Sequence, residues 1–224
     1  MRGGWLTKAI LTAANLTGAD LTGCDIHGIA AWEVQLQDAV QCNLLISAPD
    51  EDYFITVDNF QVAQFLQLLL YNQDLACLAR VSIEKLVLVP GYFPIGMENG
   101  LEAITRTLRQ ENYLPVVFQC SLPLPPTWER HLSLLASLAR FLIVDVTFSK
   151  SVPQQIEHVI AHFPSLPIQP VLHVGWKKED VLDPLKHSPS ILQTYRYSSP
   201  EELAAHMKER VIEPAEQMIW KWER

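Results

Sequence analysis

The sequence predicts an α/β protein with a short β-coil at its N-terminus, and two patterns support this prediction. Residues 14–28 read ANLTGADLTGCDIHG, a repeat with a period of five residues that neither an α-helix nor a β-strand has. From residue 84 onward, apolar runs alternate with amphipathic segments. This alternation is typical of a parallel sheet that helices cover on both faces.

The N-terminal repeat extends to five units in one register. Each unit opens with a small residue, often continues with a polar one, and has Leu or Ile third. We expect each unit to turn the chain by a quarter, so that the third residue always points inward. The units open at Gly4-Trp5-Leu6, Ala9-Ile10-Leu11, Ala14-Asn15-Leu16, Ala19-Asp20-Leu21 and Cys24-Asp25-Ile26. They resemble the pentapeptide-repeat family, which implies a right-handed quadrilateral β-helix.

The number of units predicts little more than one coil, because four units close one turn. A single coil cannot be an independent domain, so we expect that it either packs on the next part of the chain or is the remnant of a longer array cut at Met1. After Gly28 we expect a half-buried strand, in which Trp32, Val34 and Leu36 alternate with polar residues. Further strands are expected at 42–48 and 53–57.

A helix is expected over 56–75, with Asp58 as its N-cap. The predicted domains are therefore a β-coil with capping strands over 1–55, a linking helix over 56–83 and an α/β domain over 84–224.

Five strand–helix units account for the α/β domain. We expect strands at 85–91, 114–120, 140–147, 167–175 and 191–197, and helices at 99–111, 127–139, 151–163 and 199–222. In the last helix Ser199 is the expected cap, and Pro214 should bend or break it. Five such units favour a flavodoxin-like sheet with strand order 2-1-3-4-5.

A ligand site in such a sheet lies beyond the carboxyl ends of its strands, where the strand order reverses. The residues that come after the predicted strands there are Gly91, Tyr92, Phe93, Asp145, Thr147, Ser149 and His173. An acid at a strand end, hydroxyls and then the N-terminus of a helix at Ser151 could receive ribose hydroxyls and a phosphate or carboxylate. The alternative is that Asp145 caps its own loop and Ser151 caps only its helix.

The stretch RFLIVDVTFSKSVPQQIEHVI (140–160) resembles a segment of TIR-like domains and of the nucleoside deoxyribosyltransferase group. More narrowly, residues 26–216 resemble bacterial proteins that join pentapeptide repeats to a TIR-like domain. The resemblance implies binding or cleavage of N-glycosidic bonds through a helix Glu. At that position this chain has Gln155, which cannot ionise or act as a nucleophile. The nearest carboxylate, Glu157, is about 200° around the helix from Gln155.

Composition and motifs exclude several other classes of protein. A net charge of −8 and a pI near 5.3 argue against nucleic-acid binding, which depends on Lys and Arg. No segment is apolar and long enough to span a membrane, and no signal peptide is visible, so we expect a cytoplasmic protein. His158 and His162 have helical spacing but no third ligand, so no metal is expected. No cofactor motif is present, which leaves NAD or a nucleotide as a ligand that the fold could take.

Two functions remain as hypotheses. In the first, the protein is an interaction or signalling module: the TIR-like domain associates with itself or a protein partner, or recognises a nucleotide-type ligand, and the β-coil supplies an edge for oligomerisation. In the second, it is an enzyme that cleaves NAD or nucleosides, with Glu157 as the catalytic carboxylate and Asp145 on the ribose.

Overall fold

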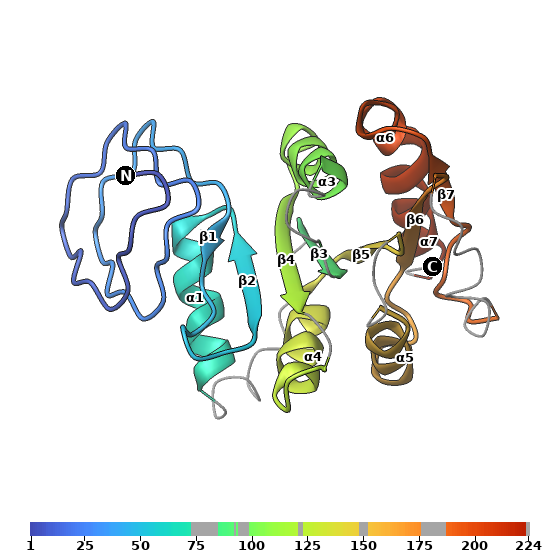
Figure 1. Ribbon diagram of the computed structural model, residues 1–224, viewed down its shortest axis with the longest axis horizontal. Coiled ribbons are helices and arrows are strands. Elements are labelled where there is room, and N and C mark those ends of the chain that lie inside the picture. Colours follow the sequence, from blue (N-terminus) through green and yellow to red (C-terminus); the bar gives the residue numbers. More distant parts are fainter. Residues whose placement is uncertain are drawn as a thin grey trace. The chain divides into compact units, whose positions relative to one another are not determined.

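The computed structural model describes residues 1–72, 85–91, 93, 99–120, 123–147, 152–175 and 187–222. The chain divides into two compact units, Met1–Arg80 and Val81–Arg224 (Figure 1). The described part of unit 1 holds the coil, two strands and one helix, whereas unit 2 holds the parallel sheet and the helices that cover it. In the described part of the chain, no helix is both long and apolar enough to cross a bilayer.

The coil of unit 1 repeats every 20 residues, as parallel bridges show. Trp5 pairs with Asp25, and the following bridges fall five residues apart until Asp25 pairs with Leu45. The third residue of each unit points inward, and Leu21 and Ile26 are fully buried. The second residue shapes the corner, because the side chains of Asn15, Asp20 and Asp25 each accept a hydrogen bond from the N–H two residues later.

The corners of the coil need a left-handed backbone at the fifth residue of each unit. Positive φ angles recur at every fifth position from Gly3 to Asn43. Glycine adopts this conformation without a steric cost, and Gly18, Gly23 and Gly28 fill it in the best-matching units. The five-residue period is therefore the spacing between corners.

The coil is longer than the sequence predicts. Bridges join Ile10 to Ala30, Asn15 to Gln35 and Asp20 to Val40, so residues 29–40 form a second turn instead of a single half-buried strand. The prediction was wrong because Ala, Trp and Glu interrupt the repeat at 31–33. The backbone nevertheless keeps its hydrogen bonds to the first turn, and Trp32 lies exposed at a corner.

Two short strands and a helix come after the coil in unit 1. β1 (Leu44–Leu45) pairs antiparallel with β2 (Tyr53–Val57). α1 (Phe60–Tyr71) begins one residue later than the expected cap, because the side chain of Asn59, and not that of Asp58, accepts from the N–H groups of Gln61 and Val62. Asp58 instead accepts from the N–H of Asn43.

The side chain of Gln67 on α1 covers the second turn of the coil at residues 26–28, on the edge that faces away from the first turn. Its amide accepts from the N–H of Gly28 and donates to the C=O of Ile26 at 3.0 Å. One turn earlier, the corresponding Lys8 N–H donates to the next turn of the coil, at His27. Gln67 therefore supplies the acceptor that a further turn would have offered to the N–H of Gly28.

Unit 2 is built on a parallel sheet of five strands in the order β4-β3-β5-β6-β7. The predicted flavodoxin-like order 2-1-3-4-5 is confirmed. The strands are β3 (Leu86–Gly91), β4 (Leu114–Cys120), β5 (Phe141–Asp145), β6 (Ile168–His173) and β7 (Tyr195–Tyr197). All residues of β3 and β5 are buried, as expected for strands covered on both faces.

Helices cover both faces of this sheet (Figure 1). α4 (Trp128–Leu138) packs beside α5 (Val152–His162) on one face. α3 (Asn99–Gln110) packs beside α6 (Pro200–Met207) on the other, where they enclose a continuous apolar core. The Ser199 side chain caps α6 by accepting from the N–H of Glu202, as predicted.

The last helix changes its hydrogen bonding just before Pro214. A π-helical turn, Lys208–Ile212, separates α6 from α7 (Glu213–Trp222). Proline has no N–H to give, and a π turn is one of the few ways in which a helix can continue through such a defect. The helix thus changes its winding where the sequence predicts a bend or break.

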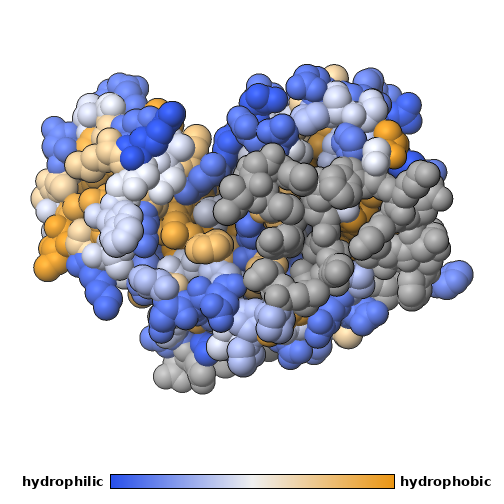
Figure 2. Space-filling view, in the orientation of Figure 1, coloured by the Kyte–Doolittle hydropathy of each residue, from blue (hydrophilic) through white to orange (hydrophobic). Residues whose placement is uncertain are grey.

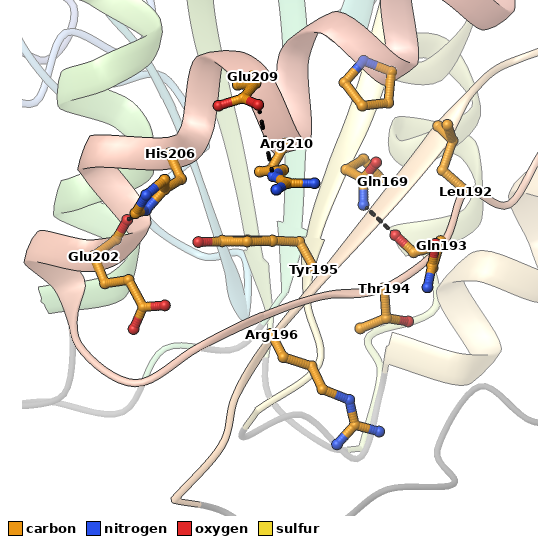
Figure 3. A pocket seen from close by; sticks show the side chains of 11 residues that line it. Gln169, Leu192, Gln193, Thr194, Tyr195, Arg196, Glu202, His206, Glu209 and Arg210 are labelled. Atoms are coloured by element: carbon orange, nitrogen blue, oxygen red, sulfur yellow. Dashed lines mark hydrogen bonds and ion pairs between the residues drawn. The ribbon is translucent and has the colours of Figure 1, made fainter.

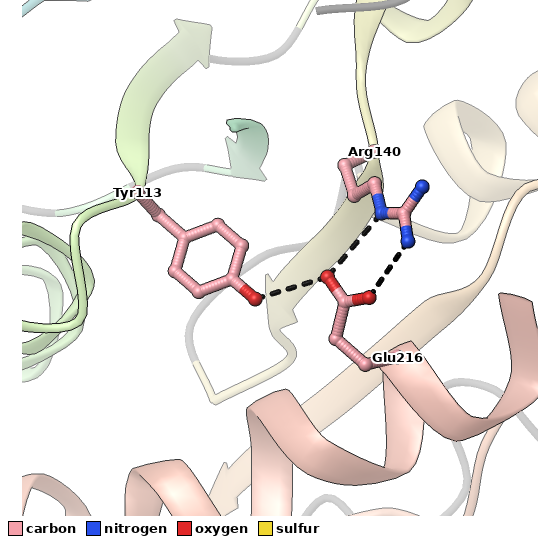
Figure 4. Close-up of polar contacts among 3 residues, drawn as sticks. All are labelled: Tyr113, Arg140 and Glu216. Atoms are coloured by element: carbon pink, nitrogen blue, oxygen red, sulfur yellow. Dashed lines mark hydrogen bonds and ion pairs between the residues drawn. The ribbon is translucent and has the colours of Figure 1, made fainter. Parts of the chain in front are cut away.

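An ion pair ties α7 to the sheet at the amino ends of the strands (Figure 4). Arg140, just before β5, contacts both carboxylate oxygens of Glu216, with a shortest distance of 2.9 Å from Nη2 to Oε2. Tyr113, just before β4, donates its hydroxyl to the same carboxylate at 2.9 Å. Three separate segments are therefore joined at one carboxylate.

Candidate functional site

The predicted site lies at the carboxyl ends of the strands, and the structure brings three of its residues together there. Asp145 ends β5 and is buried. Its Oδ1 accepts from the N–H of Thr147 at 2.8 Å, and the Thr147 hydroxyl accepts from the N–H of His173 at 3.0 Å. These contacts link the end of β5 to the end of β6.

A fourth residue, Tyr197 at the end of β7, completes this cluster. Its hydroxyl donates to Oδ2 of Asp145 at 3.0 Å, and its ring meets the ring of His173 edge-on with 5.3 Å between centroids. The N-terminus of α3 approaches the same pair at Gly100. A Cβ on Gly100 would lie 2.9 Å from the Tyr197 hydroxyl and 3.2 Å from Asp145, so only glycine fits there without displacing them.

Burial dominates the electrostatics of this cluster. It raises the pKa of Asp145, and the hydrogen bonds from Thr147 and Tyr197 oppose that rise. Burial and the neighbouring Asp145 carboxylate both raise the pKa of Tyr197, which keeps its hydroxyl protonated as a donor. Both oxygens of Asp145 thus have partners within the protein, as expected if this residue holds its own loop in place.

Gln155 lies at the same edge of the sheet, in contact with another strand. The side chain is buried in the first turn of α5, and its Nε2 donates to Sγ of Cys120, the last residue of β4. Among the described residues, its Oε1 has no hydrogen-bond partner. Burial raises the pKa of the Cys120 thiol to about 12, and the hydrogen bond from Gln155 opposes that rise.

Glu157 lies on the exposed side of α5, whereas Gln155 and Ile156 are buried. The two residues lie in the described helix Val152–His162, and their different exposure is what helical geometry predicts for positions about 200° apart.

The other predicted site residues take structural positions or are not described. Gly91 is the last residue of β3, and Phe93 packs into the apolar core while its C=O accepts from Nε2 of Gln119. Tyr92, Ser149 and Ser151 lie outside the described residues. No group of three or more His, Cys, Asp or Glu side chains with metal-binding geometry occurs in the described ranges.

A hollow of about 700 Å³ lies beside β7, and the sequence did not predict it. Figure 3 shows Tyr195 and Arg196 from β7 together with His206 from α6 and Arg210 from the π turn around it. Its charges have both signs, since Glu202 and Glu209 lie in the same wall, so the hollow has no clear preference for a cation or an anion.

Tyr197 and Gly100 are the cluster residues that sequence reasoning missed. Tyr197 had a usable signal, because it ends the fifth predicted strand and the ends of parallel strands meet at one edge. Gly100 had none, since its importance depends on a close approach between α3 and β7 that no local pattern encodes.

Comparison with known proteins confirms the repeat. The family model for pentapeptide repeats (8 copies) matches residues 2–29, so the N-terminal region carries pentapeptide repeats. A solved structure of a mutant flavo di-iron protein from Thermotoga maritima is similar over 63% of this chain, with 12% identity and a TM-score of 0.47. The matched region spans 38% of that chain, and the likeness concerns the fold alone. No curated protein matches the chain.

Proposed function

We propose that the protein is an interaction or signalling module whose TIR-like α/β domain does not catalyse a reaction. One observation carries this proposal: the polar groups at the strand ends are engaged with one another. Asp145 is bound by Thr147 and Tyr197, and the helix position that would need a carboxylate is occupied by Gln155. Cleavage of an N-glycosidic bond needs a carboxylate at the developing cation.

The surface of unit 1 supports association as the mode of action. Trp5 is 89% exposed and Ile10 is 82% exposed, although large apolar side chains of this kind are usually at least partly covered. Figure 2 shows apolar residues reaching the surface over the coil. Such side chains favour a protein surface as the partner.

A nucleotide-type ligand at the strand ends remains part of the proposal. The observation that favours it is Oε1 of Gln155, a buried acceptor that has no partner among the described residues. Polar atoms in such surroundings normally have one. The amide lies at the same edge as Asp145, where sheets of this order receive ligands.

The test is turnover at high protein concentration. The protein is incubated with NAD and a panel of nucleosides, and released nicotinamide and free bases are followed by chromatography. Glu157→Gln is the control, since it removes the carboxylate to which the enzyme hypothesis assigns catalysis. We expect no release from either protein. Release that Glu157→Gln abolishes would overturn the proposal and make the protein a glycosidase.

A further inference from the structure

The second turn of the coil has an edge that faces away from the first turn, and this edge is closed at one end. There the C=O of Cys24 accepts from the N–H of Leu45, and the N–H of Ile26 donates to the C=O of Leu45, both at 2.9 Å. The next donor along the edge, the N–H of Gly28, is bound by Gln67. A single residue of a neighbouring strand, Leu45, thus pairs with two backbone groups of the edge.

The same edge is open along the next side of the coil, residues 29–33, which we call the open stretch. Ala30 directs both its N–H and its C=O toward the first turn, so the C=O of Ile29 and the N–H of Ala31 point the other way. The N–H of Glu33 is equivalent to that of Gly28. Among the described residues, whether earlier or later in the chain, these groups of the open stretch have no hydrogen-bond partner. Unpaired edges of this kind accept a strand from another chain.

A hollow of about 520 Å³ lies beside the open stretch, and Ile29 forms part of its wall. Gln67, which binds the same edge at Gly28, lines the hollow from α1. The wall on the α1 side is partly apolar, because Leu68 is 48% exposed there. Phe65 is 40% exposed and lies on the same side of the helix, three residues earlier. A chain that pairs with the open stretch would therefore meet apolar side chains of α1.

Acidic side chains lie around this hollow. Glu33 is exposed at the corner where the open stretch ends. Tyr71, which also lines the hollow, donates its hydroxyl to Glu51 at 2.7 Å, and the neighbouring Asp50 is exposed. These carboxylates favour a partner that carries Lys or Arg, and the net charge of −8 acts in the same direction. They disfavour a second copy, which would bring its own Glu33 to the contact.

We propose that the hollow binds an extended segment of a partner protein, in which apolar and basic residues alternate. The inference rests on the proposed function, because it names the kind of partner that the interaction module takes. One residue of the segment pairs with Ile29 and Ala31 as Leu45 pairs with Cys24 and Ile26, and the segment runs parallel to the open stretch, as in the bridge at Leu45. Successive side chains of a strand point to opposite sides, so alternate ones face the apolar wall and the solvent.

The experiment uses a synthetic peptide of six residues that alternates valine with lysine and is capped at both ends. Calorimetry measures its affinity for the whole chain, and NMR follows the backbone amides. We expect the amides of Ala31 and Glu33 to shift and to become protected from hydrogen exchange. A peptide with N-methyl groups along one edge should not bind. A peptide that alternates valine with glutamate should bind about tenfold more weakly or less.

Two variants place the peptide in the hollow. Leu68→Asp puts a charge into the apolar wall, and Glu33→Lys reverses the charge at the corner. Each should raise the dissociation constant of the valine–lysine peptide about tenfold or more. Gln61→Asp is the control for the first, because Gln61 is exposed on α1 and does not line the hollow. Glu213→Lys, in unit 2, repeats the charge change of the second. Circular dichroism of the variants establishes that they fold.

Absence of binding by the valine–lysine peptide would overturn the proposal, as would equal binding of the N-methylated peptide or unchanged binding by both variants. Equal binding of the glutamate peptide would overturn the basic class of partner. Self-association of the free protein that Leu68→Asp abolishes would make the occupant a second copy instead. The turnover test is separate: release of base removes the proposed function whether or not the peptide binds, whereas a failure to bind without release of base removes only this inference.

Discussion

Tyr197 donates its hydroxyl to Asp145 at 3.0 Å, and this bond joins the ends of two strands that are not neighbours. β6 lies between β5 and β7, and its last residue, His173, is held by Thr147. The cluster therefore fastens three strand ends together. The buried carboxylate of Asp145 has its hydrogen-bond partners within the protein. For this reason we propose association, and not catalysis, as the function.

Removal of the Tyr197 hydroxyl should destabilise unit 2. Tyr197→Phe leaves a buried oxygen of Asp145 without its donor, and hydrogen bonds to charged groups contribute about 1.5–3 kcal/mol. Denaturant unfolding at neutral pH measures the change. The loss should be smaller in acid, where Asp145 is protonated more readily because burial raises its pKa.

The matched control for this change is Tyr195→Phe. Tyr195 is on the same strand, only partly buried, and makes no hydrogen bond through its hydroxyl within the described ranges. Its free energy of unfolding should change by less than about 0.5 kcal/mol. Equal losses of stability from the two substitutions would show that the loss in Tyr197→Phe does not come from the contact with Asp145.

Glu216 should make the stability of the protein depend on pH in the acid range. Burial would raise the pKa of this carboxyl, but hydrogen bonds from Arg140 and Tyr113 outweigh it and hold the pKa below 4.5. A depressed pKa gives stability that is complete above pH 4.5 and is lost as the pH falls through the folded value. We expect the unfolding temperature of the wild type to fall there, and that of Glu216→Gln to fall less steeply.

Glu213→Gln serves as the control for the acid effect, since Glu213 begins the same helix but is exposed. Its pH profile should match that of the wild type. If Glu213→Gln flattens the profile as much as Glu216→Gln does, the effect belongs to overall charge and not to the Arg140 contact.

The sheet of unit 2 was predictable because each strand carries its own signal. Buried strands such as 141–145 are continuous apolar runs, and caps such as Ser199 mark where helices begin. The second turn of the coil was not predictable in the same way. Ile29 and Leu36 keep its inward positions, but its stability comes from backbone bonds to residues 20 positions earlier, which do not depend on side-chain identity.

From the sequence, the candidate site could be assigned to the correct edge of the sheet, but its full set of residues could not be predicted. Topology placed Asp145, Thr147 and His173 together because parallel strands end on the same side. It could not reveal that Tyr197 would use the free oxygen of Asp145. Helical spacing correctly separated Gln155 from Glu157, since a fixed angle per residue needs no tertiary information.

Gln67 should be important for the closed end of the coil. Gln67→Ala leaves the N–H of Gly28 and the C=O of Ile26 without this partner, at a cost of about 1–3 kcal/mol. The measurement is denaturant unfolding, with Gln64→Ala as the control on the preceding turn of the same helix. A similar loss from Gln64→Ala would indicate that the helix, and not the contact with the coil, is affected.

The corners of the coil should respond to glycine in opposite ways at two positions. Ala13 has φ of 57°, where an L-residue is strained, and Ala13→Gly should stabilise the protein by up to about 1 kcal/mol. Gly18 has φ of 68° and open space around its Cβ position, so Gly18→Ala changes the backbone energy alone. It should destabilise by about 1 kcal/mol. Thermal unfolding of both variants tests this account, because changes of the same sign would show that packing, and not the left-handed corner, sets the five-residue period.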